Sequence, residues 1–142
     1  MPAAPPPALE AFPARAHDKL RYADTDRQGH VNNAVFATFL ETGRVELLYD
    51  PAAPLAGPGA SFVIASLRLD LRAELTWPGR VEIGTGVLKI GTSSLTLAQA
   101  LYQGATCAAT GETVIVQVGP DGRPLPLGAA AVVRLSALRL PG

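Results

Sequence analysis

The sequence predicts an α+β fold in which one long helix is wrapped by a curved, mainly antiparallel sheet. Two observations carry this prediction. Residues 33–48 place apolar side chains every three or four positions, which is the period of an amphipathic helix. From residue 61 the period changes to two, in runs separated by short turns that are typical of antiparallel strands. A strongly apolar helix is buried most economically when the sheet curls around it.

The first elements are predicted from composition and alternation. Residues 1–15 are rich in Pro and Ala and are predicted to be a flexible tail, which leaves residues 16–142 as a single domain. Residues 20–23 (L-R-Y-A) alternate and predict a short strand. Gly43, inside the helix predicted over 33–48, weakens that helix, so we expect the helix to lie close against another backbone there.

The predicted strands follow the helix in order. They cover residues 61–72, 80–90, 94–103 and 112–118, with turns at 77–80, at Gly104 and at Thr110–Gly111. In the first of them, alternation indicates one covered face made of Ala65, Leu67, Leu69 and Leu71. Residues 128–139 predict a short closing helix.

Length and composition narrow the function classes. The chain has 142 residues, 48% of them hydrophobic, and a formal net charge of zero, so it lacks the basic excess of nucleic-acid-binding proteins. Its single cysteine, Cys107, excludes an internal disulfide and fits a reducing compartment. The sequence shows neither a secretory signal nor an apolar run of the ~18 residues that a membrane span needs. We therefore expect a cytoplasmic protein without nucleic-acid or membrane partners.

The polar stretch at residues 22–33 (Y-A-D-T-D-R-Q-G-H-V-N-N) precedes the helix and raises the question of a metal site. Asp24, Asp26 and Gly29 match the start of a calcium-binding EF-hand loop. However, Val35 occupies the position at which a bidentate Glu completes that loop. The sequence therefore predicts no metal site here.

Two other interpretations of this stretch remain open on spacing alone. In the first, Asn32 or Asn33 is simply the N-cap of the helix and the loop has no chemistry. In the second, the unpaired backbone N–H groups of the helix N-terminus bind a developing oxyanion. A carboxylate just before them then acts as base or nucleophile. The second arrangement suits the hydrolysis of a thioester, whose thiolate leaves readily.

Residues 21–46, R-Y-A-D-T-D-R-Q-G-H-V-N-N-A-V-F-A-T-F-L-E-T-G-R-V-E, resemble the start of the hotdog-fold acyl-CoA thioesterases of the 4-hydroxybenzoyl-CoA thioesterase type. The resemblance covers roughly residues 18–127, and the Asp-x-Asp-x-x-Gly-His-Val-Asn-Asn block is its specific part. It implies a hotdog fold, hydrolysis of an acyl-CoA or acyl-carrier-protein thioester, no cofactor, and a homodimer or homotetramer with active sites at subunit interfaces.

The resemblance also implies roles for individual residues. Asp26 matches the catalytic carboxylate, acting as base or nucleophile, and Asn33 matches the position whose backbone N–H faces the thioester carbonyl. The remaining matched positions are assigned to substrate binding: Gly29, where the loop turns under the helix, and His30, Val31 and Asn32. Asp24 is expected to be structural.

Several alternatives accompany this hypothesis. The chain could be a hotdog protein that binds an acyl or aromatic ligand without turnover. A hotdog dehydratase is disfavoured because His30 follows Asp26 by four residues rather than five and no Asn-Pro context is present. Glu41 and Glu46 match the helical carboxylate of a related thioesterase group, but they are expected to lie on the polar face with Arg44. Cations available for CoA phosphates are Arg68, Arg72, Arg80, Lys89, Arg123 and Arg134.

Overall fold

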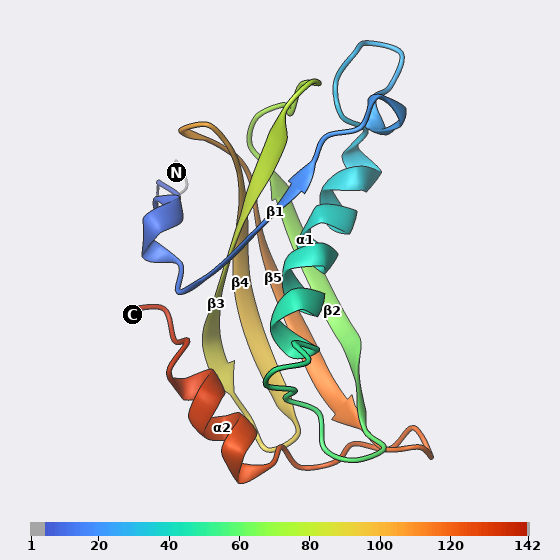
Figure 1. Ribbon diagram of the computed structural model, residues 1–142, viewed down its shortest axis with the longest axis vertical. Helices are drawn as coiled ribbons and strands as arrows, with labels where there is room; N and C mark the ends of the chain where they lie inside the picture. The colour runs from blue at the N-terminus through green and yellow to red at the C-terminus, as the bar shows by residue number, and fades with distance from the viewer. Residues whose placement is uncertain (1–4, 142) are drawn as a thin grey trace.

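Five antiparallel strands form one curved sheet around a long helix in the computed structural model, which describes residues 5–141 (Figure 1). The sheet order is β1-β3-β4-β5-β2, and the helices are α1 (Asn33–Leu48) and α2 (Ala129–Ser136). The strands are β1 (Ala14–Lys19), β2 (Ser61–Leu71), β3 (Arg80–Ile90), β4 (Ser94–Gln103) and β5 (Thr106–Val118). This arrangement confirms the predicted α+β class and the hotdog fold.

The bounds of α1, β3 and β4 agree with the prediction, whereas β5 begins earlier than expected. The turn predicted at Thr110–Gly111 is wrong, because both residues are paired within the sheet. Gly111 has a packing role instead. A Cβ there would lie 3.0 Å from Leu40 Cδ1, so the missing side chain lets the helix approach the strand.

The N-terminal predictions need two corrections. Residues 20–23 do not form a strand: Tyr22–Asp24 is a 3-10 turn, and the strand lies earlier, at β1, where it pairs with β3. The predicted tail is also partly ordered. Residues Leu9–Ala11 form a 3-10 turn, and Phe12 is 2% exposed because its ring lies on Gly84. Residues 1–4 lie outside the described part of the chain.

A band of buried polar side chains crosses the interior and separates two apolar clusters. Gln99 Nε2 donates to Thr85 Oγ1 and to the Leu40 carbonyl, both at 3.0 Å, and Arg44 Nη1 donates to Gln99 Oε1 at 3.3 Å. We call Arg44, Thr85 and Gln99 the polar band. One apolar cluster contains Phe36, Phe39, Leu40, Ile83 and Leu101. The other contains Leu48, Val87, Leu97, Ile115 and Leu135.

The polar band corrects two expectations about α1. Arg44 was expected on the polar face of the helix, but it is buried at 4% exposure, and burial lowers its pKa, against the opposing charge of Glu41. Gly43 does lie in a crowded place, as expected, but the atoms next to it belong to side chains rather than to another backbone. A Cβ at Gly43 would lie 2.6 Å from Ile83 Cγ2 and 2.9 Å from Gln99 Nε2.

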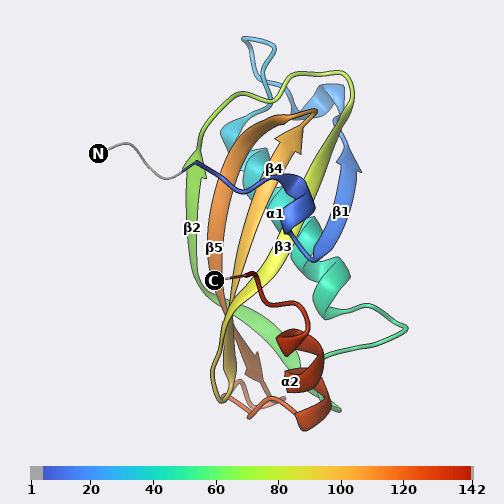
Figure 2. The same cartoon turned by 90° about the vertical axis from the view of Figure 1, so that its left-hand side faces the viewer.

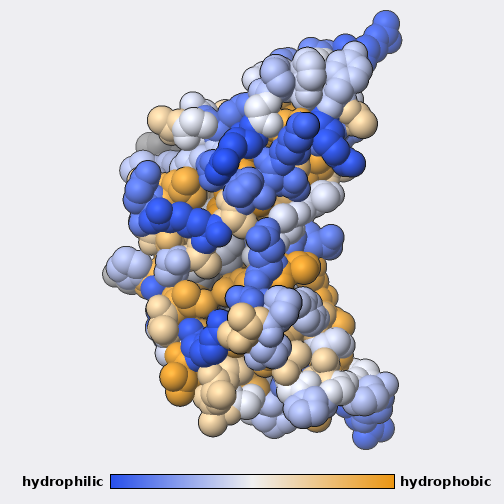
Figure 3. Space-filling model, viewed as in Figure 1, coloured by the Kyte–Doolittle hydropathy of each residue, from blue (hydrophilic) through white to orange (hydrophobic). Residues whose placement is uncertain are grey.

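Strand β2 is an edge of the sheet, opposite the β1 edge (Figure 2). The prediction that one face of β2 is covered is therefore wrong within a single chain. Leu69 is partly buried, but Leu67 is 40% and Leu71 48% exposed. Figure 3 shows hydrophilic residues gathered at the end where α1 begins and apolar ones more frequent over the opposite half of this face. None of the helices within residues 5–141 is long and apolar enough to cross a membrane.

Candidate active site

A tight turn before α1 presents Asp26. The Asp26 N–H donates to the His30 carbonyl at 2.8 Å, and the Gly29 N–H donates to the Asp26 carbonyl at 3.0 Å. Gly29 has φ +82°, a left-handed conformation that glycine adopts without strain, and this explains why the turn needs a glycine. Thr25 and Val31 close the loop with an antiparallel bridge. Hydrogen bonds within this short loop therefore fix the backbone position of Asp26.

The carboxylate of Asp26 accepts hydrogen bonds from described residues through only one of its two oxygens. Its Oδ1 accepts the backbone N–H of Gln28 at 2.9 Å and that of His30 at 3.3 Å. Its Oδ2 has no hydrogen bond to another described residue, and the side chain is exposed. One oxygen thus fixes the carboxylate, while the other is left for a ligand or a water molecule.

Asp24 has the opposite surroundings. It is 2% exposed, and its carboxylate accepts the Arg21 backbone N–H at 2.9 Å and the Arg21 guanidinium at 2.8 Å. Burial acts to raise the pKa of Asp24, but the hydrogen bonds and charge of Arg21 outweigh it and lower that pKa below its usual value. Its own carbonyl accepts the Asn32 N–H at 2.8 Å. Asp24 therefore supports the loop and the start of α1, as expected.

The N-terminus of α1 supplies an unpaired donor. Asn32 is the N-cap, and its Oδ1 accepts the Ala34 N–H at 3.0 Å. The Asn33 N–H has no hydrogen-bond partner among the described residues, as expected for the first residue of a helix. The positive end of the helix dipole adds to this donor. A carbonyl oxygen that gains negative charge is therefore favoured at this position.

These groups meet in one pocket of about 330 Å³ at the end of the molecule where α1 begins. Its lining includes four of the predicted site residues, Asp26, His30, Val31 and Asn33. Gly29 and Asn32 do not line it: they shape the turn and cap the helix. Val31 is 3% exposed and also belongs to the core.

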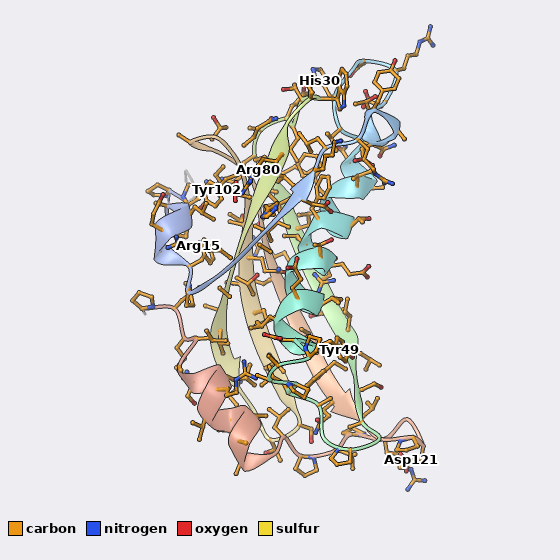
Figure 4. The ribbon with its side chains drawn as sticks, in the orientation of Figure 1. Arg15, His30, Tyr49, Arg80, Tyr102 and Asp121 are labelled. Atoms are coloured by element: carbon orange, nitrogen blue, oxygen red, sulfur yellow. The ribbon has the colours of Figure 1, made fainter. Side chains whose placement is uncertain are left out.

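The sequence prediction missed another wall of this pocket, which is formed by the last residue of β2 and the three residues after it, 71–74. His30 Nε2 lies 2.6 Å from Glu74 Oε2 in that wall, and Figure 4 shows His30 at the end of the molecule away from Tyr49. Arg72 also lines the pocket. No motif marks these residues, because only the fold brings them to within reach of Asp26.

The other predicted alternatives lie elsewhere. Glu41 and Glu46 are exposed on α1 and do not line this pocket. Within residues 5–141, no group of three or more His, Cys, Asp or Glu side chains could hold a metal ion. The pocket thus brings together a carboxylate, the first residue of a helix, a histidine and an arginine.

Fold and site together define a hotdog protein with an acidic residue in the loop that precedes its central helix. The family model of the thioesterase-like superfamily matches residues 20–135, and the chain belongs to that family. This confirms the family that the sequence predicted. No curated protein matches the chain.

Solved structures from three bacteria are similar to this chain over most of its length. The PA5185 protein of Pseudomonas aeruginosa strain PAO1 is 28% identical, with a TM-score of 0.85, over 96% of this chain and 98% of that one. A Thermus thermophilus thioesterase complexed with coenzyme A and Zn is 29% identical, with a TM-score of 0.78, over 94% and 98%. A predicted thioesterase of Bacillus stearothermophilus is 29% identical, with a TM-score of 0.80, over 91% and 98%.

Proposed function

We propose that this protein is an acyl-CoA thioesterase that hydrolyses the thioester to a free acid and CoA. The observation that carries the proposal is the pocket shared by Asp26 and Asn33, in which the described residues leave one carboxylate oxygen and one helix N-terminal N–H without a hydrogen-bond partner. Membership of the thioesterase-like superfamily supports the reaction class. The coenzyme A complex of the Thermus thermophilus relative supports CoA as the leaving group.

In the proposed mechanism, the thioester carbonyl oxygen accepts a hydrogen bond from the Asn33 N–H. Asp26 either removes a proton from water, which attacks the carbonyl carbon, or attacks that carbon itself. Negative charge moves to the carbonyl oxygen, where the helix N-terminus stabilises it. The C–S bond then breaks and CoA leaves as the thiolate. In the nucleophilic route, water afterwards hydrolyses the acyl-Asp26 anhydride and regenerates the carboxylate.

The walls of the pocket suit the remaining parts of such a substrate. Phe36 and Leu71 provide apolar surface for an acyl group, and Arg72 provides a cation for a CoA phosphate. His30 and Val31 are assigned to substrate binding, whereas Gly29 and Asn32 act through the loop and the cap.

We also infer that the working form is a homo-oligomer in which a second copy adds to the β2 edge. Four large apolar side chains of this strand are between 40% and 49% exposed: Val63, Ile64, Leu67 and Leu71. An edge strand with such side chains invites pairing with another strand. Because Leu71 also lines the pocket, a partner on β2 would lie beside the site.

The test follows thiol release from a panel of acyl-CoAs of different chain lengths, aromatic ones included. We expect the wild type to cleave at least one substrate, and Asp26→Asn to lower kcat by roughly a hundredfold or more. Asp121→Asn, on an exposed turn remote from the pocket, is the matched control and should keep activity. The proposal fails if no thioester is cleaved, or if folded Asp26→Asn keeps full activity. Saturable acyl-CoA binding without thiol release would favour the non-catalytic alternative.

A further inference from the structure

Among the described residues, Glu74 is the acidic side chain that the fold brings onto the candidate site histidine. Its Oε2 lies 2.6 Å from His30 Nε2, and both residues line the pocket that contains Asp26. The Glu74 side chain is 61% exposed, so it contributes little to the core. Residue 74 lies between β2 and β3, whereas His30 lies before α1, so the contact joins two segments that are far apart in the sequence.

The other ring nitrogen of His30 restricts how the imidazole can be protonated. Nδ1 is buried and has no hydrogen-bond partner among the described residues. A proton on Nδ1 would therefore be a buried donor without an acceptor, which is costly, whereas a bare acceptor nitrogen costs less. Glu74 accepts a proton carried by Nε2. The Glu74 contact and the unpartnered Nδ1 together favour a hydrogen on Nε2 rather than on Nδ1.

The backbone of residue 30 is hydrogen-bonded to Asp26, so the position of His30 affects the position of the Asp26 carboxylate. The His30 N–H donates to Asp26 Oδ1 at 3.3 Å, and the His30 carbonyl accepts the Asp26 N–H at 2.8 Å. His30 also forms an antiparallel bridge with Thr76, two residues beyond Glu74. The ring contact and this bridge together tie the Asp26 loop to the wall of the pocket that residues 71–74 form.

We propose that Glu74 is a positioning residue that fixes the orientation and tautomer of His30 and, through its backbone, the carboxylate of Asp26. The effect on catalysis rests on the proposed thioesterase function, but the effect on the ring does not. Asp26 and Arg72 are the other charged groups in the lining of the same pocket.

The first test measures the ¹⁵N shifts of the histidine ring nitrogens, which report where the proton lies, and needs no substrate. The chain has two histidines, so His17→Gln assigns the signals. We expect the hydrogen of wild-type His30 to reside on Nε2, and Glu74→Ala to shift the ring toward a mixture of forms. Exposed His17 should not respond. Unchanged His30 signals in Glu74→Ala would overturn the proposal.

The second test is kinetic and uses the acyl-CoA cleaved fastest. Glu74→Ala should lower kcat by roughly ten- to a hundredfold with a smaller change in KM, because orientation rather than binding is lost. Glu74→Gln retains an acceptor oxygen and should recover part of the rate. Glu112→Ala, an exposed glutamate on β5, is the matched control.

A double-mutant cycle decides whether Glu74 acts through His30. In a His30→Ala background, Glu74→Ala should cost little further activity, because the residue that it positions is gone. An undiminished effect in that background would overturn the proposal. If the wild type cleaves no thioester, the proposed function fails, while the ring measurement still decides whether Glu74 fixes His30.

Discussion

Asp24 and Asp26 are two positions apart in one loop, yet their carboxylates have opposite surroundings. Asp24 is buried against Arg21, whereas Asp26 is exposed with one oxygen unpaired among the described residues. A carboxylate bound on all sides supports structure, and one that keeps an open oxygen can meet a substrate. Residue identity alone does not distinguish the roles of the two aspartates, whereas the groups around each carboxylate do.

Asp24→Asn should destabilise the protein at neutral pH while leaving Asp26 in place. The expected loss is about 1 kcal/mol, the usual size of a capping interaction. Because the folded-state pKa of Asp24 is lowered, its stabilisation is present above the unfolded value near 3.8 and is lost as the pH falls through the folded value. Urea unfolding of both proteins should therefore show a gap at pH 7 that narrows below about pH 4. A gap independent of pH would contradict this account.

At the scale of elements, α1 and the sheet fit closely at Gly43. Gly43→Ala should destabilise the fold by about 1–3 kcal/mol through overpacking, because the new Cβ would lie 2.6 Å from Ile83 Cγ2. This loss is the net change after the gain of about 1 kcal/mol that alanine brings to a helix. Thermal or urea unfolding measures this change in the free energy of unfolding, with Thr38→Ala on the exposed side of α1 as control. A more stable Gly43→Ala variant would show that the helix can move away from the sheet.

The elements also show which parts of the fold the sequence can predict and why the other parts cannot be predicted from it. Helix α1 and strands β3 and β4 have strong periods and clear turns, so their bounds follow from pattern. Strand β1 (A-R-A-H-D-K) is an edge strand with little apolar character, and only its pairing with β3 reveals it. The same limit applies to the site. The Asp26 loop is contiguous and recognisable, but Glu74 reaches it only through the fold.

At the scale of the whole molecule, the proposed association through β2 can be tested at its exposed apolar side chains. Ile64→Lys should raise the dissociation constant of the oligomer, because it places a charge on an apolar edge strand. Light scattering coupled to size-exclusion chromatography measures the change. Val133→Lys makes the same kind of substitution on α2, at a residue that is 70% exposed, and should leave the mass unchanged. A monomeric wild type, or an Ile64→Lys variant of unchanged mass, would contradict association through β2.

The polar band of Arg44, Thr85 and Gln99 divides this small domain into two compartments. The compartment beside the candidate site holds Phe36 and Ile83, and the remote one holds Leu97 and Leu135. Side chains on opposite sides share few neighbours, so substitutions made in each should have nearly additive effects on the free energy of unfolding. The remote compartment can therefore accumulate sequence changes over evolution, or be redesigned for thermal robustness, while the end that holds the candidate site keeps its geometry.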